Sequence, residues 1–107
     1  MQHQELAAGR WFTLSLPEQL AHIGSEIHRA SRWHGRDTAL FESAVARALE
    51  LFDLTISDRR WRARLKEVAR ARELFCRIVF HTPAYGTTLA DLDAYFFRFA
   101  LLARQQR

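Results

Sequence analysis

Histidine, cysteine and carboxylate side chains are the residues here that could bind a metal or act in catalysis. His22 and Glu26 lie four residues apart, a spacing that places both on one face of a predicted helix and allows chelation. No second pair of this kind occurs on another predicted helix, and the Glu-x-x-His pairs of di-iron bundles are absent. Cys76 and His81 are five residues apart, also without a matching pair. The spacing therefore predicts no metal site, and we expect no cofactor.

Nucleophilic catalysis has no better support in the sequence. Cys76 falls on the apolar side of its predicted helix, and nothing marks a third group that would orient a Cys–His pair. There is no phosphate-binding glycine loop and no serine elbow motif. A single cysteine fits a reducing compartment, and neither a secretory signal nor a long apolar run is present. We therefore expect a cytoplasmic protein.

Four segments carry helical periodicity with recognisable ends, and no stretch alternates like a strand. The first follows the capping residue Ser15 and stops at Gly35, and the second opens at Asp37. Asp58 caps the third, which reaches about Phe80, and the fourth follows "HTPAYGTT", with Thr88 and Asp91 spaced as a capping box. Short connections predict an all-α, up-down-up-down four-helix bundle over residues 15–107. Residues 1–14 form a short N-terminal arm that packs partly on the bundle through Trp11, Phe12 and Leu14.

Positive charge is concentrated on the third predicted helix. Residues 58–77 contain eight basic and three acidic residues, a net charge of +5, so the other 87 residues of this +4 chain sum to −1. On a helical wheel the basic face lies opposite an apolar stripe of Trp61, Leu65, Val68, Phe75 and Val79. That basic face consists of Arg59, Arg62, Lys66, Arg70 and Arg77.

The basic face has three interpretations. The favoured one is a solvated surface partly balanced by acidic residues of the second helix, namely Glu42, Glu50 and Asp53. A phosphate-binding face is the second, because counterion release rewards such a stripe, although no aromatic side chains are interleaved for base stacking. An acidic protein partner is the third.

Arg72 is the cation that falls inside the apolar stripe of the third helix. A buried arginine needs a carboxylate partner, and Asp93 and Glu26 are the candidates. This set of buried polar residues is either an interior salt bridge or the wall of a polar pocket between helices. On the first helix, Gly24 and Ser31 are small enough to admit an aromatic side chain from the opposite helix.

The fourth predicted helix is apolar on two sides. One stripe, which we expect to be buried, consists of Leu89, Leu92, Phe96, Phe99 and Ala103. Ala94, Phe97 and Leu101 form a second apolar stripe on the far side. Either the N-terminal arm or another subunit covers such a stripe, and we favour a homodimer, the common two-fold solution.

Four blocks of the chain resemble a group of small uncharacterised bacterial helical proteins: "GSEIHRASRW", "RALELFDLTISD", "RLKEVARARE" and "YGTTLADLDAYFFRFALLAR". By shape the chain looks like the HEPN and nucleotidyltransferase-substrate-binding bundles, which often serve as the partner of a separate catalytic chain. This resemblance implies a bundle that binds another protein of a bacterial system, such as a nucleotidyltransferase or a toxin.

HEPN domains include ribonucleases that use an Arg and a His separated by four to six residues. "RASRWH" places Arg29 four intervening residues before His34, so the resemblance implies these two as candidate catalytic residues. The chain departs from the family in two respects: Ala30 follows the arginine, where a polar residue is usual, and the motif lies on the first helix. On the wheel, Arg29 points outward and His34 towards the core.

The sequence therefore predicts a non-enzymatic protein-interaction module, dimeric and able to bind a second protein. The alternative is an RNA-binding protein, or a HEPN-like ribonuclease, that uses the basic face of the third helix.

Overall fold

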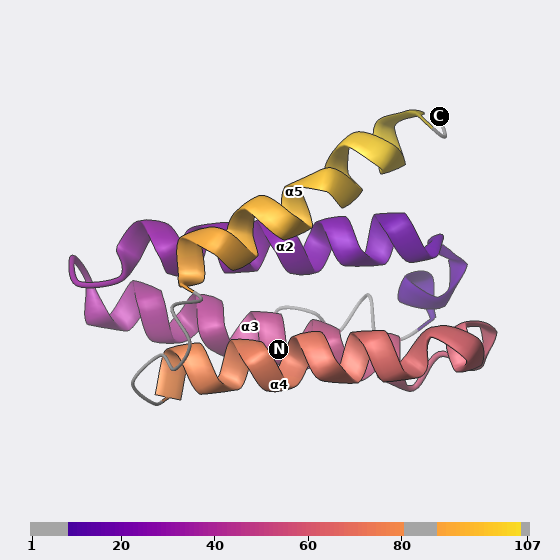
Figure 1. The fold of residues 1–107 in the computed structure, drawn as a ribbon, viewed down its shortest axis with the longest axis horizontal. Coiled ribbons are helices and arrows are strands. Elements are labelled where there is room, and N and C mark those ends of the chain that lie inside the picture. Colours follow the sequence, from indigo (N-terminus) through magenta and orange to yellow (C-terminus); the bar gives the residue numbers. More distant parts are fainter. Residues whose placement is uncertain (1–8, 81–87, 106–107) are drawn as a thin grey trace.

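The computed structural model describes residues 9–80 and 88–105. Within these residues the chain is helical, with no strand, which confirms the predicted all-α bundle (Figure 1). The elements are η1 (Arg10–Thr13), α2 (Leu16–Trp33), α3 (Thr38–Ile56), η2 (Arg59–Arg64), α4 (Leu65–Phe80) and α5 (Leu89–Gln105). None of the described helices is both long and apolar enough to span a bilayer.

The helix starts follow the capping residues that the sequence indicates. Ser15 and Glu18 form a reciprocal capping box at the start of α2. The backbone N of Ser15 lies 2.9 Å from Oε1 of Glu18, and the backbone N of Glu18 lies 3.3 Å from Oγ of Ser15. Thr88 and Asp91 do the same at the start of α5, at 2.9 and 3.1 Å. The Asp37 carboxylate accepts a hydrogen bond from the first turn of α3. The predicted starts of these three helices are therefore confirmed.

The start of the third predicted helix is different. Asp58 caps the 3₁₀ helix η2, and the α-helix begins only at Leu65. Trp61 has φ −101° and ψ 20°, which interrupts the helical geometry. Because a 3₁₀ turn has three residues rather than 3.6, a continuous helical wheel misplaces the side chains before the break. The predicted burial of Leu65 is wrong, since 37% of this residue is exposed, whereas Val68 and Phe75 are buried as expected.

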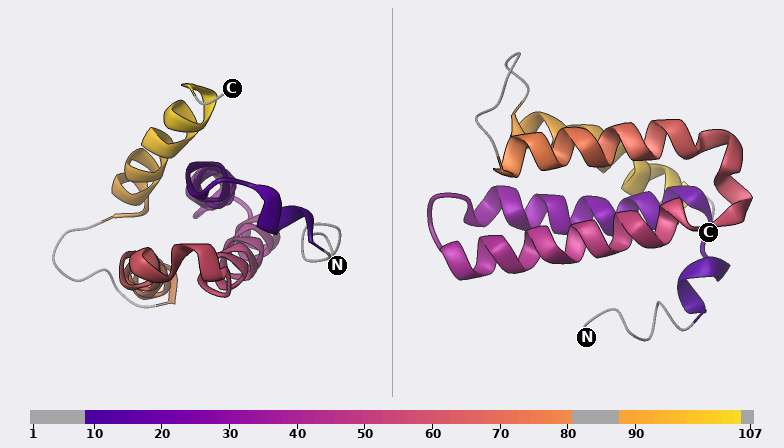
Figure 2. Two further views of the ribbon diagram at one scale, coloured as in Figure 1. Left: turned by 90° about the vertical axis from the view of Figure 1, so that its right-hand side faces the viewer. Right: turned by 90° about the horizontal axis from the view of Figure 1, so that it is seen from below.

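Helix α2 lies at the centre of the bundle, and α3 and α5 both pack along it (Figures 1 and 2). The two helices α2 and α5 approach closely at Gly24, where an added Cβ would lie 2.9 Å from the Cβ of Phe96. This confirms the expectation that a small residue on α2 admits an aromatic side chain from another helix. Helix α4 packs mainly on α3 and has few contacts with α5. Helix α4 therefore lies apart from α5, although the two are consecutive helices of the chain.

The core contains aromatic side chains from four elements. Trp11 of η1, Phe52 of α3, Phe75 of α4 and Phe96 of α5 are all buried in one core cluster. The rings of Phe52 and Phe96 meet edge to face at 5.9 Å, a favourable arrangement. Part of the N-terminal arm therefore belongs to the core, while Phe12 next to it is exposed.

Candidate interaction site

The outer side of α5 carries the second apolar stripe that the sequence predicts. Phe97 is 59% exposed and Leu101 is 45% exposed, and Ala94 in the same stripe is also exposed. On the opposite side of α5, Leu92, Phe96 and Ala103 are buried. We refer to Ala94, Phe97 and Leu101 as the α5 stripe. The described part of the chain leaves this stripe open to solvent.

A groove of about 650 Å³ runs beside Phe97, between α2 and α5. His28, Arg29, Arg32 and Trp33 line its α2 side, with Asp93 on the α5 side. The Nδ1 atom of His28 lies 3.0 Å from Oδ2 of Asp93, so this pair joins the two helices. The Arg32 guanidinium lies 5.4 Å from the centre of the Trp33 ring. The groove therefore combines aromatic surface with cationic and anionic groups next to the α5 stripe.

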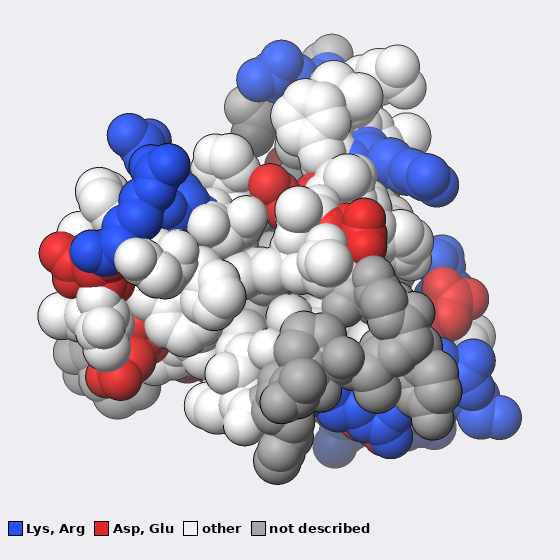
Figure 3. Space-filling view, turned by 60° about the vertical axis from the view of Figure 1, so that its left-hand side comes forward, with Lys and Arg blue, Asp and Glu red and all other residues white. Residues whose placement is uncertain are grey.

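The charges on one side of the molecule surround an uncharged area. In Figure 3, Lys and Arg side chains lie towards the margins, and the middle is mainly uncharged apart from a few acidic side chains.

Arg29 and His34 have separate surroundings. Nη1 of Arg29 lies 2.8 Å from Oε1 of Glu26, and Arg29 lines the groove. His34 does not line it. Its ring lies 5.1 Å from that of Phe41, and the residue is exposed. The predicted core-facing position of His34 is wrong because α2 ends at Trp33 and the chain turns out of helical geometry at His34.

His28 is a residue of this site that the sequence did not indicate. Its partner, Asp93, is 65 residues away in the chain, and no local pattern links the two. Asp93 was predicted as a buried partner of Arg72, but it is only half-buried and pairs with His28.

The pairing predicted for Arg72 is also wrong. Nε of Arg72 lies 2.9 Å from Oδ1 of Asp53 on α3, and Nη1 lies 3.7 Å from Sγ of Cys76. The Arg72 side chain is half-buried and that of Asp53 is exposed, so the pair lies at the surface between α3 and α4 rather than in the core. Arg72 reaches α3 because α4 packs on α3 more closely than on α5.

Glu26, in contrast, is buried. Its Oε1 atom accepts a hydrogen bond from Arg29, and lies 3.6 Å from Nε of Arg47 on α3. The carboxylate therefore joins α2 to α3 and has neither His22 nor Arg72 as a partner within hydrogen-bond range.

The basic face of the third predicted helix is exposed along its whole length. Arg77 pairs with Glu73 at 2.8 Å. The other four residues of the basic face have no ion pair with a described residue, and these are Arg59, Arg62, Lys66 and Arg70. The acidic residues of α3 therefore make no ion pair with the basic face, and Asp53 pairs instead with Arg72, which is not part of it.

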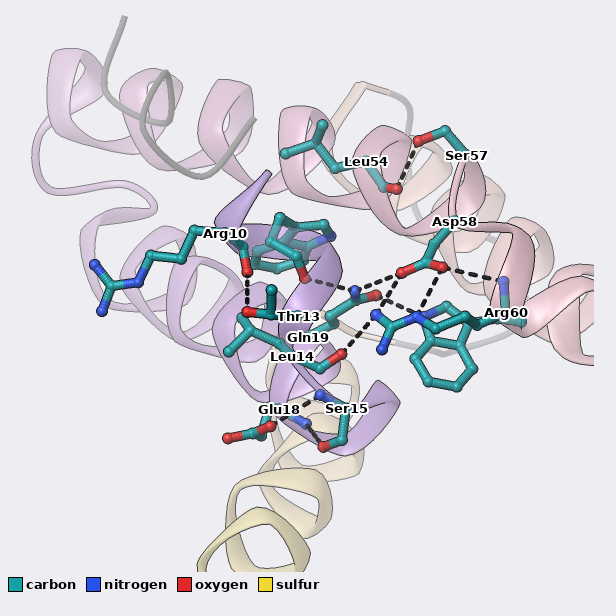
Figure 4. A network of polar contacts seen from close by, with 12 residues as sticks. Arg10, Thr13, Leu14, Ser15, Glu18, Gln19, Leu54, Ser57, Asp58 and Arg60 are labelled. Atoms are coloured by element: carbon teal, nitrogen blue, oxygen red, sulfur yellow. Dashed lines mark hydrogen bonds and ion pairs between the residues drawn. The ribbon is translucent and has the colours of Figure 1, made fainter. Parts of the chain in front are cut away.

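A buried polar network joins η1, α2 and η2 (Figure 4). Nε2 of Gln19 donates to the Trp11 carbonyl at 3.0 Å and to Oδ2 of Asp58 at 2.9 Å. Oε1 of Gln19 accepts from Nε1 of Trp61 at 2.9 Å. Arg60 pairs with Asp58 at 2.7 Å and lies 4.4 Å from the centre of the Trp61 ring. The network holds η1 and η2 on α2.

The network shifts the titration of both its charged members. Hydrogen bonds from the Arg60 guanidinium lower the pKa of Asp58 from 3.8 to about 2, and burial acts in the opposite direction. Hydrogen bonds from the Gln19 side chain and the Arg60 backbone N–H also lower the pKa of Asp58. The same pairing raises the pKa of Arg60. Asp58 in the fold therefore stays ionised at acidic pH values at which an ordinary aspartate takes up a proton.

No cluster of three or more His, Cys, Asp or Glu side chains within the described ranges is arranged to hold a metal ion. Glu26, one half of the chelating pair considered above, is occupied by two arginines. His81, which was considered with Cys76, lies outside the described residues.

The chain was compared with known families, curated proteins and solved structures, and no match was found in any of the three comparisons.

Proposed function

We propose that this chain is a non-enzymatic interaction module that associates through the α5 stripe. The observation that carries the proposal is the exposure of Phe97 and Leu101 on a helix whose opposite side is already buried. Contiguous exposed apolar side chains cost free energy in water, and in soluble proteins they commonly mark a contact with another molecule.

The charge pattern of α5 favours a second copy of the chain as the partner. Asp91 and Asp93 lie near the N-terminal end of the helix, whereas Arg98 and Arg104 lie towards its C-terminal end. In an antiparallel two-fold pair, the N-terminal half of one helix faces the C-terminal half of the other. Arg98 and Arg104, which have no ion pair with a described residue, would then lie near the acidic end of the partner helix, in addition to the contacts that Asp91 and Asp93 make within their own chain. Phe97 is the middle residue of Leu89–Gln105 and would pack near the two-fold axis.

Sedimentation velocity of the full chain at tens of micromolar tests this proposal. We expect the natural chain to sediment as a dimer and the double variant Phe97→Ser with Leu101→Ser to sediment as a monomer. Phe80→Ser is the matched control, because Phe80 is 60% exposed but lies at the end of α4. A monomeric natural chain, or a control that dissociates equally, would refute association through the α5 stripe.

Four cations of the basic face have no ion pair with a described residue, which favours a second candidate function, binding of RNA. Arg62, Lys66 and Arg70 would contact phosphates, and affinity would fall steeply with salt. A gel shift at two salt concentrations, with these three residues changed to Ala, distinguishes this function from the first. Cleavage of the RNA that is lost in His34→Ala would instead identify a ribonuclease.

A further inference from the structure

Helices α4 and α5 face each other across a second groove, of about 460 Å³. The groove exists because α5 packs along α2, where Gly24 admits Phe96, and makes few contacts with α4. The end-on view in Figure 2 shows α5 lying over α2 and apart from α4. Ala71 and Leu74 of α4, with Leu92 and Tyr95 of α5, form the apolar part of its wall.

The two acidic side chains that line this groove already have partners. Oε2 of Glu67 accepts hydrogen bonds from Arg64 at 3.0 and 3.3 Å. Oδ2 of Asp91 accepts the Thr88 backbone N–H at 2.9 Å as part of the α5 capping box. Arg64 therefore offsets the charge of Glu67, and the backbone N–H groups at the N-terminus of α5 offset part of the charge of Asp91.

The two cations of the groove wall are in the opposite situation. Lys66 and Arg70 lie one turn apart on α4 and are both exposed. Neither makes an ion pair, a side-chain hydrogen bond or a ring contact with a described residue. The groove therefore offers an apolar wall with two available positive charges at one side, which is complementary to an anion with an apolar body.

The size of the groove indicates what kind of anion fits. Eight described residues line it, whereas a stable protein interface involves about 20–30 residues on each side. Its volume of about 460 Å³ falls within the range of roughly 300–1,000 Å³ that is usual for small-molecule sites. A small molecule fits these dimensions better than a protein partner does.

We infer that the α4–α5 groove binds a small amphiphilic anion. Its carboxylate or similar head group lies between Lys66 and Arg70, and its hydrocarbon part lies against Leu74, Leu92 and Tyr95. No residue of the α5 stripe lines this groove, so the inference does not depend on association of the chain through α5.

An NMR titration of the ¹⁵N-labelled full chain with sodium octanoate tests the inference, with 1-octanol as the uncharged analogue. We expect saturable shifts of amide signals from Ala71, Leu74, Leu92 and Tyr95. The double variant Lys66→Gln with Arg70→Gln is expected to raise the octanoate Kd about tenfold, because two exposed ion pairs are lost. The octanol Kd is expected to change by less than about twofold.

The matched control is Arg59→Gln with Arg62→Gln, which removes the same net charge from the basic face but from outside the groove. This control should keep octanoate binding, as should the α5-stripe double variant. Equal loss of binding in the two charge variants would overturn the inference, since it would show attraction to net charge alone. Shifts that do not saturate, or that fall outside the groove, would also overturn it.

Discussion

The Gln19 side chain on α2 donates a hydrogen bond to the Asp58 carboxylate, 39 residues further along the chain, at 2.9 Å (Figure 4). The same side-chain amide also donates to the Trp11 carbonyl and accepts from the Trp61 indole N–H. It is buried, and both its donor and its acceptor groups are used. A buried network of this kind fixes the relative positions of the segments that it joins.

Replacing Gln19 with Leu is expected to destabilise the fold by about 2–3 kcal/mol. The new side chain has a similar volume but leaves the Trp61 indole and the Trp11 carbonyl without their partner, which is more costly than the loss of a balanced hydrogen bond. Urea denaturation of the natural chain and the variant measures the difference. Gln105→Leu, at the exposed end of α5, is the control and should change stability by less than about 0.5 kcal/mol.

The free energy of unfolding should depend on the ionisation of Asp58. Since its pKa in the fold is about 2, below the ordinary value of 3.8, its contribution is complete above about pH 4 and is lost as the pH falls through 2. The natural chain should exceed Asp58→Asn in stability by on the order of 2 kcal/mol at pH 6. Urea melts of both proteins from pH 6 to pH 2 test this, and a difference that does not narrow at low pH would contradict the assignment.

Replacing Gly24 with Ala is expected to lower stability by about 1–2 kcal/mol, although alanine favours helices. The new methyl group would lie 2.9 Å from Cβ of Phe96, an atom close to the backbone that moves only if α5 moves. The cost of such overpacking, roughly 1–3 kcal/mol, exceeds the gain in helix propensity of at most about 1 kcal/mol. Thermal melting measures the effect, and Ser25→Ala on the exposed side of α2 serves as the reference. A more stable Gly24→Ala protein would show that α2 and α5 are not held this closely.

The Arg72–Asp53 pair should contribute little to stability. Both side chains have contact with water, so a double-mutant cycle with Arg72→Ala and Asp53→Ala should give a coupling of about 0.2–1 kcal/mol. An interior pair of Arg72 with Asp93 or Glu26 would instead make Arg72→Ala cost about 3–5 kcal/mol. Chemical denaturation of the three variants distinguishes these values.

The sequence by itself was sufficient for the parts of the fold that depend on local chemistry. Ser15, Asp37 and Thr88 accept backbone N–H groups a few residues away, so the start of each helix is encoded within one turn. The two sides of α5 could also be distinguished, because a regular helix fixes which residues share a face. The functional role of the α5 stripe remains a prediction.

The tertiary structure alone decided which charged groups meet and where grooves form. The partners of Arg72 and His28 depend on how far α4 and α5 lie from their neighbours, and helical periodicity within one segment carries no information about that distance. The break at Trp61 likewise lies where η2 meets α2 through Gln19, and Leu65, the first residue of α4, is exposed against its sequence pattern. Local patterns determine helices because hydrogen bonds within a helix join near neighbours, whereas contacts between helices depend on the packing of the whole chain.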